Sequence, residues 1–127
     1  MGVLRFIIIN FFFITLSFGC KEIANKKELT FSNCKVFIEG DLFSGEFEMF
    51  QSNKYILSTV KKGILKNEKI FKNERLLTER SFDSCNTGYQ TIFNPDGKLN
   101  CEGYFLEDKR IGLWKFYIKD SMYTIKY

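Results

Sequence analysis

Apolar and polar residues alternate in short runs along most of the chain. Alternation is seen at Val36 and Ile38, again from Phe43 to Met49, and from Leu99 to Phe105. A period of two over runs of this length, bounded by turn residues, predicts half-buried β-strands. The tetrapeptide Asn94-Pro-Asp-Gly97 is a turn signal between two such runs. The pattern therefore predicts an all-β domain built from hairpins.

A spacing recurs along these runs and indicates internal repeats. Glycine, three residues, an apolar residue and an aromatic residue recur at 45–50, 88–93 and 112–117, and a fourth copy at 66–71 has lysine for glycine. The aligned aromatics are spaced 21, 22 and 24 residues apart, and they are Phe50, Phe71, Phe93 and Tyr117. This period suits one two-stranded unit per repeat, so we expect about four units stacked into one elongated antiparallel meander.

Glycines recur where a side chain would interfere. Gly45, Gly88 and Gly112 begin the repeated spacing, while Gly97 falls in a turn and Gly103 within a strand. A positive φ angle, or a backbone packed closely beneath an aromatic residue of the next unit, tolerates no Cβ.

The single tryptophan, Trp114, has two interpretations. It is the stacking aromatic of its repeat, facing the neighbouring unit, which is the interpretation we favour. The alternative is an exposed anchor for a partner protein.

The N-terminus has the pattern of an export signal. Arg5 is followed by an apolar run from Phe6 to Phe18, which ends at Ser17-Phe-Gly-Cys20. The run is shorter than the ~20 apolar residues that a transmembrane helix needs. It resembles a bacterial lipoprotein signal, in which residues 1–19 are removed and Cys20 is lipidated. An ordinary signal cut nearby, or a buried start to the first strand, is the alternative.

This resemblance predicts an address and a domain division. Acyl chains on Cys20 would hold the protein on a membrane, because each buried methylene contributes about 0.8 kcal/mol. Polar residues 20–28 form the expected tether, and residues 29–127 the repeat domain. We expect a cell-envelope location, on the periplasmic or surface face of the outer membrane. Lys21-Glu22 weakly resembles a surface-export signal.

Composition argues against several classes of function. The net charge is +4 with Lys and Glu interspersed, so no nucleic-acid-binding patch is expected. Histidine is absent, which removes the commonest general base and metal ligand, and we expect no metal and no cofactor. Glu46 and Glu48 share a strand face, but such spacing is typical of a solvated sheet face. We therefore expect no enzyme activity and no small-molecule substrate.

Export makes disulfide bonding feasible, and three cysteines follow Cys20. Cys34 and Cys85 lie near expected strand ends, whereas Cys101 lies in mid-strand. We predict that Cys34 pairs with Cys85 and that Cys101 is a packed residue.

The third repeat, running into the fourth, resembles the variant MORN repeat of bacterial proteins. The residues that carry the resemblance are Asn94, Asp96, Gly97, Lys98, Leu99, Glu102, Gly103, Gly112, Trp114 and Tyr117. The resemblance implies an elongated, twisted meander of β-hairpins. Many such proteins carry the label of the YwqK-type antitoxin family.

From these patterns we predict a lipid-anchored protein whose repeat sheet is a non-enzymatic protein-binding or scaffold surface. Tyr89, Tyr104 and Tyr123 form the expected contact face. The alternative is an antitoxin or immunity protein that neutralises a specific toxin. A toxin-like product of the neighbouring gene would favour that alternative.

Overall fold

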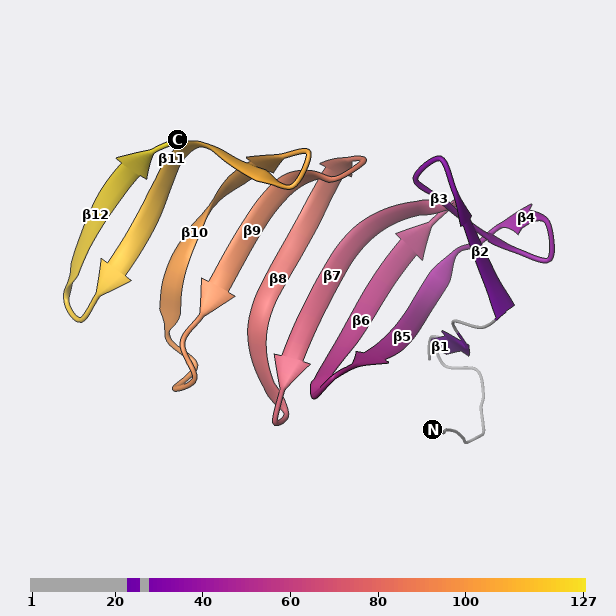
Figure 1. The fold of residues 1–127 in the computed structure, drawn as a ribbon, viewed down its shortest axis with the longest axis horizontal. Coiled ribbons are helices and arrows are strands. Elements are labelled where there is room, and N and C mark those ends of the chain that lie inside the picture. The colour runs from indigo at the N-terminus through magenta and orange to yellow at the C-terminus, as the bar shows by residue number, and fades with distance from the viewer. Residues whose placement is uncertain (1–22, 26–27) are drawn as a thin grey trace.

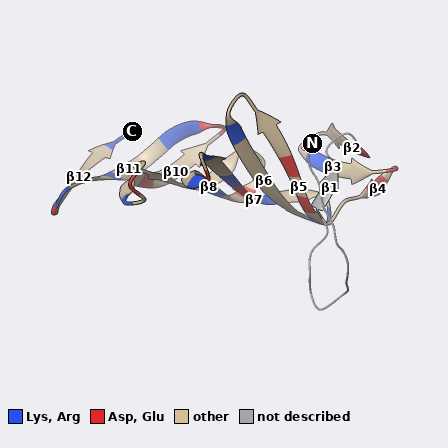
Figure 2. Cartoon of the chain, turned by 90° about the horizontal axis from the view of Figure 1, so that it is seen from below, with Lys and Arg blue, Asp and Glu red and all other residues tan. Residues whose placement is uncertain are grey.

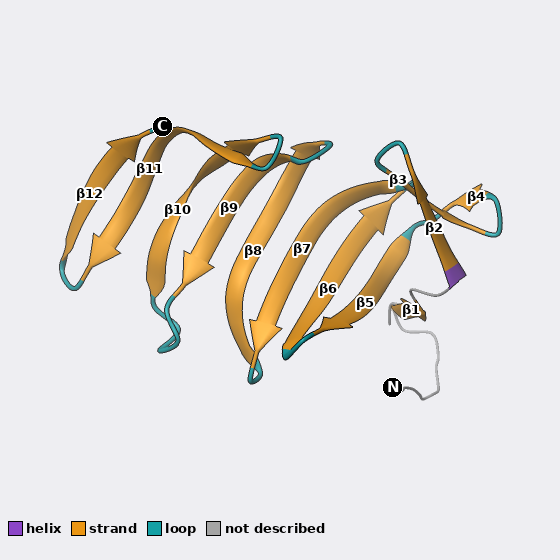
Figure 3. Ribbon diagram, in the orientation of Figure 1, coloured by secondary structure: helices purple, strands orange, loops and turns teal. Residues whose placement is uncertain are grey.

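The computed structural model describes residues 23–25 and 28–127, and this part of the chain is all-β, as the alternating pattern predicted. Short loops join the strands (Figure 3). The strands are β1 (Ile23–Asn25), β2 (Leu29–Ser32), β3 (Lys35–Ile38), β4 (Asp41–Leu42), β5 (Gly45–Gln51), β6 (Lys54–Lys61), β7 (Ile64–Lys72), β8 (Arg75–Ser84), β9 (Thr87–Phe93), β10 (Leu99–Leu106), β11 (Lys109–Ile118) and β12 (Ser121–Lys126).

Most strands belong to one long sheet. Strands β5 to β12 are antiparallel neighbours in chain order, which confirms the predicted meander (Figure 1). A second, three-stranded sheet is formed by β2, β3 and β4 at the N-terminal end. The predicted signal, residues 1–19, and Cys20 lie outside the described residues.

Strand β1 lies within the predicted tether, residues 20–28, and it pairs in parallel with β5 through Glu46, Phe47 and Glu48. The long sheet therefore takes up a strand that precedes residue 29. Sequence alternation cannot indicate a three-residue strand, because so short a run has no measurable period.

The register of the long sheet gives it two different faces. Across the strands, one row on the polar face comprises Glu48, Leu57, Lys69, Glu79, Thr91, Glu102 and Lys115. The neighbouring row on the apolar face comprises Met49, Ile56, Ile70, Thr78, Ile92, Cys101 and Phe116. All buried side chains of this sheet lie on the apolar face, and they are Phe47, Ile56, Ser58, Val60, Cys101, Phe105 and Trp114. The alternation of apolar and polar residues in the sequence corresponds to these two faces of the sheet.

The small sheet packs on the apolar face at its N-terminal end. Its core contains Leu29, Val36, Phe43, Phe47 and Val60. The turn between β6 and β7 joins the two sheets, since Gly63 accepts a hydrogen bond from the Val36 amide (2.8 Å) and donates one to the Phe43 carbonyl (2.7 Å). Gly63 has a φ angle of +79°, and a Cβ there would lie 2.5 Å from the Leu42 side chain. The positive φ angle and the close approach both favour glycine at this junction.

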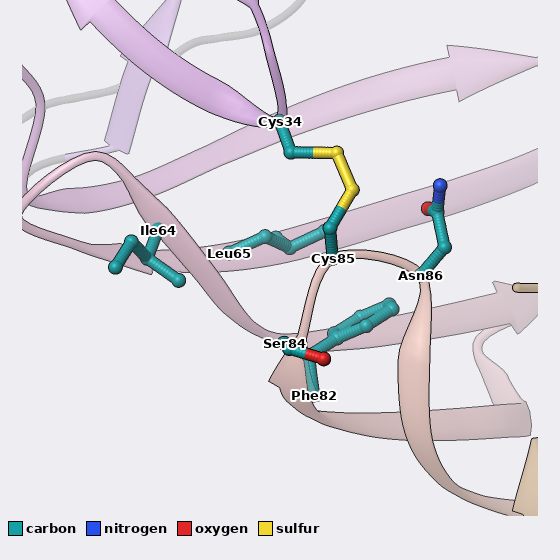
Figure 4. A pocket seen from close by; sticks show the side chains of 7 residues that line it. All are labelled: Cys34, Ile64, Leu65, Phe82, Ser84, Cys85 and Asn86. Carbon is teal, nitrogen blue, oxygen red and sulfur yellow. A yellow bond between two sulfur atoms is a disulfide. The ribbon is translucent and has the colours of Figure 1, made fainter. Parts of the chain in front are cut away.

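The sequence-predicted disulfide is present. Cys34, in the turn between β2 and β3, is bonded to Cys85, in the turn between β8 and β9, with Cα atoms 5.8 Å apart (Figure 4). It closes a loop with a sequence separation of 51 residues. The bond therefore ties the small sheet to the middle of the long sheet.

Candidate protein-binding surface

The internal repeats correspond to alternate strands of the long sheet. The four aligned aromatics lie on the polar face of β5, β7, β9 and β11, and they are Phe50, Phe71, Phe93 and Tyr117. Tyr55 on β6 bridges the first two, with ring centroids 5.1 Å from Phe50 and 5.8 Å from Phe71. The repeats that residue spacing predicted therefore correspond to β-hairpins that lie next to one another in the sheet.

Trp114 is a packing residue. Its side chain is 0% exposed, and its Nε1–H donates a 2.8 Å hydrogen bond to the Tyr104 carbonyl. The indole covers Gly103 of the preceding strand, where a Cβ would lie 2.5 Å from ring atoms. This close approach explains the glycine at position 103, as expected from the sequence. Because it is inaccessible, Trp114 is not the partner anchor that the alternative interpretation required.

Arg110 closes the other side of this indole. Its guanidinium carbon lies 4.4 Å from the centroid of the Trp114 ring, and its Nη1 donates a 2.9 Å hydrogen bond to the Tyr127 hydroxyl. A cation over an aromatic face is attracted by the ring quadrupole. The sequence analysis did not single out Arg110, because the contact depends on the register between β10 and β11.

Three tyrosines gather around one carboxylate on the polar face. The Tyr117 hydroxyl donates a 2.6 Å hydrogen bond to Glu102, and the rings of Tyr89 and Tyr104 contact edge to face at 4.8 Å. These four residues come from three neighbouring strands, β9, β10 and β11. We call Tyr89, Tyr104, Tyr117 and Glu102 the tyrosine patch.

The Glu102 carboxylate and partial burial favour the neutral form of the Tyr89 and Tyr117 hydroxyls. Partial burial, with the hydrogen bond to Glu102, raises the pKa of Tyr89 to about 12. For Tyr117 the hydrogen bond to Glu102 is the leading cause of a raised pKa. A phenol that donates to a carboxylate resists ionisation, because deprotonation would place two negative charges together. The hydroxyls of Tyr89 and Tyr117 therefore stay neutral and directed at Glu102, and the aromatic rings of the patch are left for contact.

Exposed apolar side chains border the tyrosine patch. Tyr104 is 54% exposed, and Ile111, its cross-strand partner, and Leu113 are 39% and 60% exposed. Apolar and aromatic side chains gathered on a solvent-facing surface are typical of protein interaction sites. Of the predicted contact face, Tyr89 and Tyr104 lie together here.

Tyr123 does not join them. It pairs with Phe116 and stacks on that ring at 5.3 Å with an interplanar angle of 14°, on the apolar face. Tyr123 lies on the opposite face from Tyr89 and Tyr104, because the face that a residue occupies depends on strand register, which composition does not show. Tyr117, which the sequence identified only as a repeat aromatic, belongs to the patch instead.

The other carboxylates of the polar face are held by neutral donors. Glu48 accepts a 2.8 Å hydrogen bond from the Tyr55 hydroxyl, and Glu79 accepts one of 3.0 Å from Asn67. Glu46 and Glu48 share the face as expected, with Thr59 3.4 Å from Glu46. Lys, Arg, Asp and Glu are intermixed along the described chain (Figure 2).

A half-buried ionisable pair lies on the apolar face. Glu68 is opposite Arg80, whose guanidinium lies 4.7 Å from the Phe105 ring centroid and forms a 3.1 Å ion pair with Asp108. Burial raises the pKa of Glu68, and Arg80 opposes that shift. Neither residue was singled out from the sequence, since each looks like an ordinary charge on a solvated strand.

A small open pocket lies beside the disulfide and is lined by Cys34, Ile64, Leu65, Phe82, Ser84, Cys85 and Asn86 (Figure 4). Its volume of about 50 Å³ holds a few waters, whereas ligand sites span roughly 300–1,000 Å³. Within residues 23–25 and 28–127, no group of three metal-ligating side chains occurs, and no helix could cross a bilayer.

The fold and surface define a class: an open β-hairpin repeat sheet with a small second sheet clamped to one end. No protein-family model and no curated protein matches the sequence. The resemblance to variant MORN repeats therefore depends on the motif residues of the third and fourth repeats.

Proposed function

We propose that this chain is a lipid-anchored protein whose long sheet binds another protein in the cell envelope, without enzymatic activity of its own. The observation that carries the proposal is the tyrosine patch with its apolar border. Tyrosine supplies large contact area and a hydroxyl at low conformational cost, which is why it is enriched where proteins bind. The patch lies on the polar face, where no other part of the described chain covers it.

The geometry of the patch suits a flat or extended partner. Tyr104, Ile111 and Leu113 lie exposed on adjacent strands of one sheet face. Rigid strands fix these side chains in place, so little ordering entropy is lost on binding. A protein surface, with its own apolar centre, is the ligand class that fits.

Envelope attachment is tested by intact mass and detergent partitioning of the protein expressed in a Gram-negative host. We expect the mass of residues 20–127 plus acyl groups, with the protein in the detergent phase. Cys20→Ala should remove both, because only a thiol forms the thioether that carries the lipid. Retention of residues 1–19 by the wild-type protein, or a water-soluble lipid-free form, would contradict the address and favour a cytoplasmic antitoxin.

The contact surface is tested by placing a photo-crosslinking amino acid at Tyr104 in the full chain. We expect a crosslinked adduct with a partner protein in cells, and at least a fivefold weaker adduct, roughly, when Leu113→Ala removes the apolar neighbour. Phe50, exposed on the same face two hairpins away, is the matched control position and should give no adduct. Equal adducts from both positions, or none from Tyr104, would refute the proposed surface. A toxin in the adduct would instead identify an immunity protein.

A further inference from the structure

The C-terminal edge of the long sheet is open. Strand β12 pairs with β11 over six consecutive positions with no register shift, and its outer side has no neighbour among the described residues. Its residues are all exposed, including Met122, Tyr123 and Ile125. Unpaired backbone N–H and C=O groups along such an edge are a template for another strand.

This edge lacks the features that usually prevent pairing. It contains no proline and no bulge, and Lys126 is its only charge. By contrast, the opposite edge of the long sheet is partly occupied by β1, and the outer strands of the small sheet are four and two residues long. Association through β12 would therefore close as a dimer rather than extend into a fibre.

We infer that β12 pairs antiparallel with β12 of a second copy, about a two-fold axis at Tyr123. The Tyr127 amide donates inward to the Gly112 carbonyl, so the alternate residues Met122, Thr124 and Lys126 direct their backbone groups outward. In the inferred register Met122 lies opposite Thr124 of the second copy and forms the hydrogen-bonded pairs. Tyr123 lies opposite itself in a non-hydrogen-bonded pair.

Charge selects this register over its neighbours. The axis at Tyr123 places Lys126 of each copy opposite Asp120 of the other, so the interface contains two such pairs. Among the described residues the only ion pair joins Arg80 to Asp108, so neither Lys126 nor Asp120 is ion-paired within this part of the chain. An axis at Thr124 would place Lys126 opposite Met122, and an axis at Ile125 would place it opposite Thr124. Only the first register pairs both charges.

The stacking of aromatic side chains would also continue across the two-fold axis. Tyr123 already stacks on Phe116, and the second copy would extend this to a row of four rings on one apolar face. Aromatic cross-strand pairs favour antiparallel pairing. Both tyrosine patches would then lie on the same side of one continuous sheet, so a partner with two contact sites would gain avidity.

The test uses cysteine scanning in the full chain. Cross-strand Cα atoms of a non-hydrogen-bonded pair lie about 4.5 Å apart, within the range that a disulfide spans. Tyr123→Cys should therefore give a covalent dimer on mild oxidation of whole-cell extracts. Thr124→Cys and Ile125→Cys are the matched controls, and each should give about tenfold less, because their Cα atoms would lie beyond that range.

A charge exchange distinguishes a specific interface from disulfide formation by random collision. With Tyr123→Cys present, Lys126→Asp should lower dimer yield about tenfold, because two attractive pairs become repulsive. Adding Asp120→Lys should restore it. A main dimer from Thr124→Cys or Ile125→Cys, no dimer from any variant, no rescue by Asp120→Lys, or crosslinking of Tyr123→Cys mainly to a different protein would each overturn the inference.

Discussion

Trp114→Ala should lower the free energy of unfolding by about 3–5 kcal/mol, the cost of removing a large buried aromatic side chain. The indole is 0% exposed and lies between Gly103 and the Arg110 guanidinium. Its removal leaves a void, loses the cation–π contact and leaves the Tyr104 carbonyl without its donor. Because small domains have about 5–15 kcal/mol of stability, the loss would be a large fraction of the total.

Urea denaturation of wild type and variant measures this effect. Leu113→Ala, an adjacent but exposed position, is the control and should change stability by no more than about 0.5 kcal/mol. Trp114→Phe keeps most of the ring but not the Nε1–H donor, so we expect an intermediate loss of about 1–2 kcal/mol. A loss below about 1 kcal/mol for Trp114→Ala would show that the repeat does not depend on its stacking residue.

Removing the disulfide with Cys34→Ala and Cys85→Ala should cost about 4 kcal/mol, which is the chain-entropy value for a loop of this length. The bond joins turns 51 residues apart, so its loss frees a large part of the unfolded chain. In the folded state the small sheet keeps its hydrogen bonds to Gly63 and its apolar core. The fold should therefore survive with reduced stability.

Two measurements test whether the stability comes from the disulfide and whether the bond holds the small sheet in place. A reductant should destabilise the wild type by the same amount and leave the double variant unchanged, whereas Cys101→Ala should respond to reductant as the wild type does. Hydrogen exchange should accelerate more in β2, β3 and β4, which the bond ties to the long sheet, than in β10 and β11, which lie away from it. Equal acceleration throughout would mean that the disulfide does not clamp the small sheet in particular.

Turns between the hairpins show how local sequence and backbone geometry agree. The two-residue turns Asn73-Glu74 and Glu107-Asp108 have positive φ at both residues, the geometry that matches the twist of antiparallel strands. Asn and Asp tolerate this region, while Glu does so at a cost. The left-handed conformation of Glu107 could not be predicted from the sequence, because Glu carries no left-handed signal.

Sequence by itself determined the all-β class, the period of the hairpin units and the need for glycine beneath an aromatic residue. These follow from local properties: alternation of period two, recurrence at fixed spacing, and the absence of a Cβ. Only the tertiary structure decided that Tyr117 joins Tyr89 at Glu102 while Tyr123 faces the other way. It also decided that Arg110 covers Trp114 and that β1 pairs with β5. Each of these depends on strand register and pairing partner, where a shift of one residue exchanges the two faces. Such long-range choices are set by the packing of the whole sheet, so no single stretch of the chain contains them.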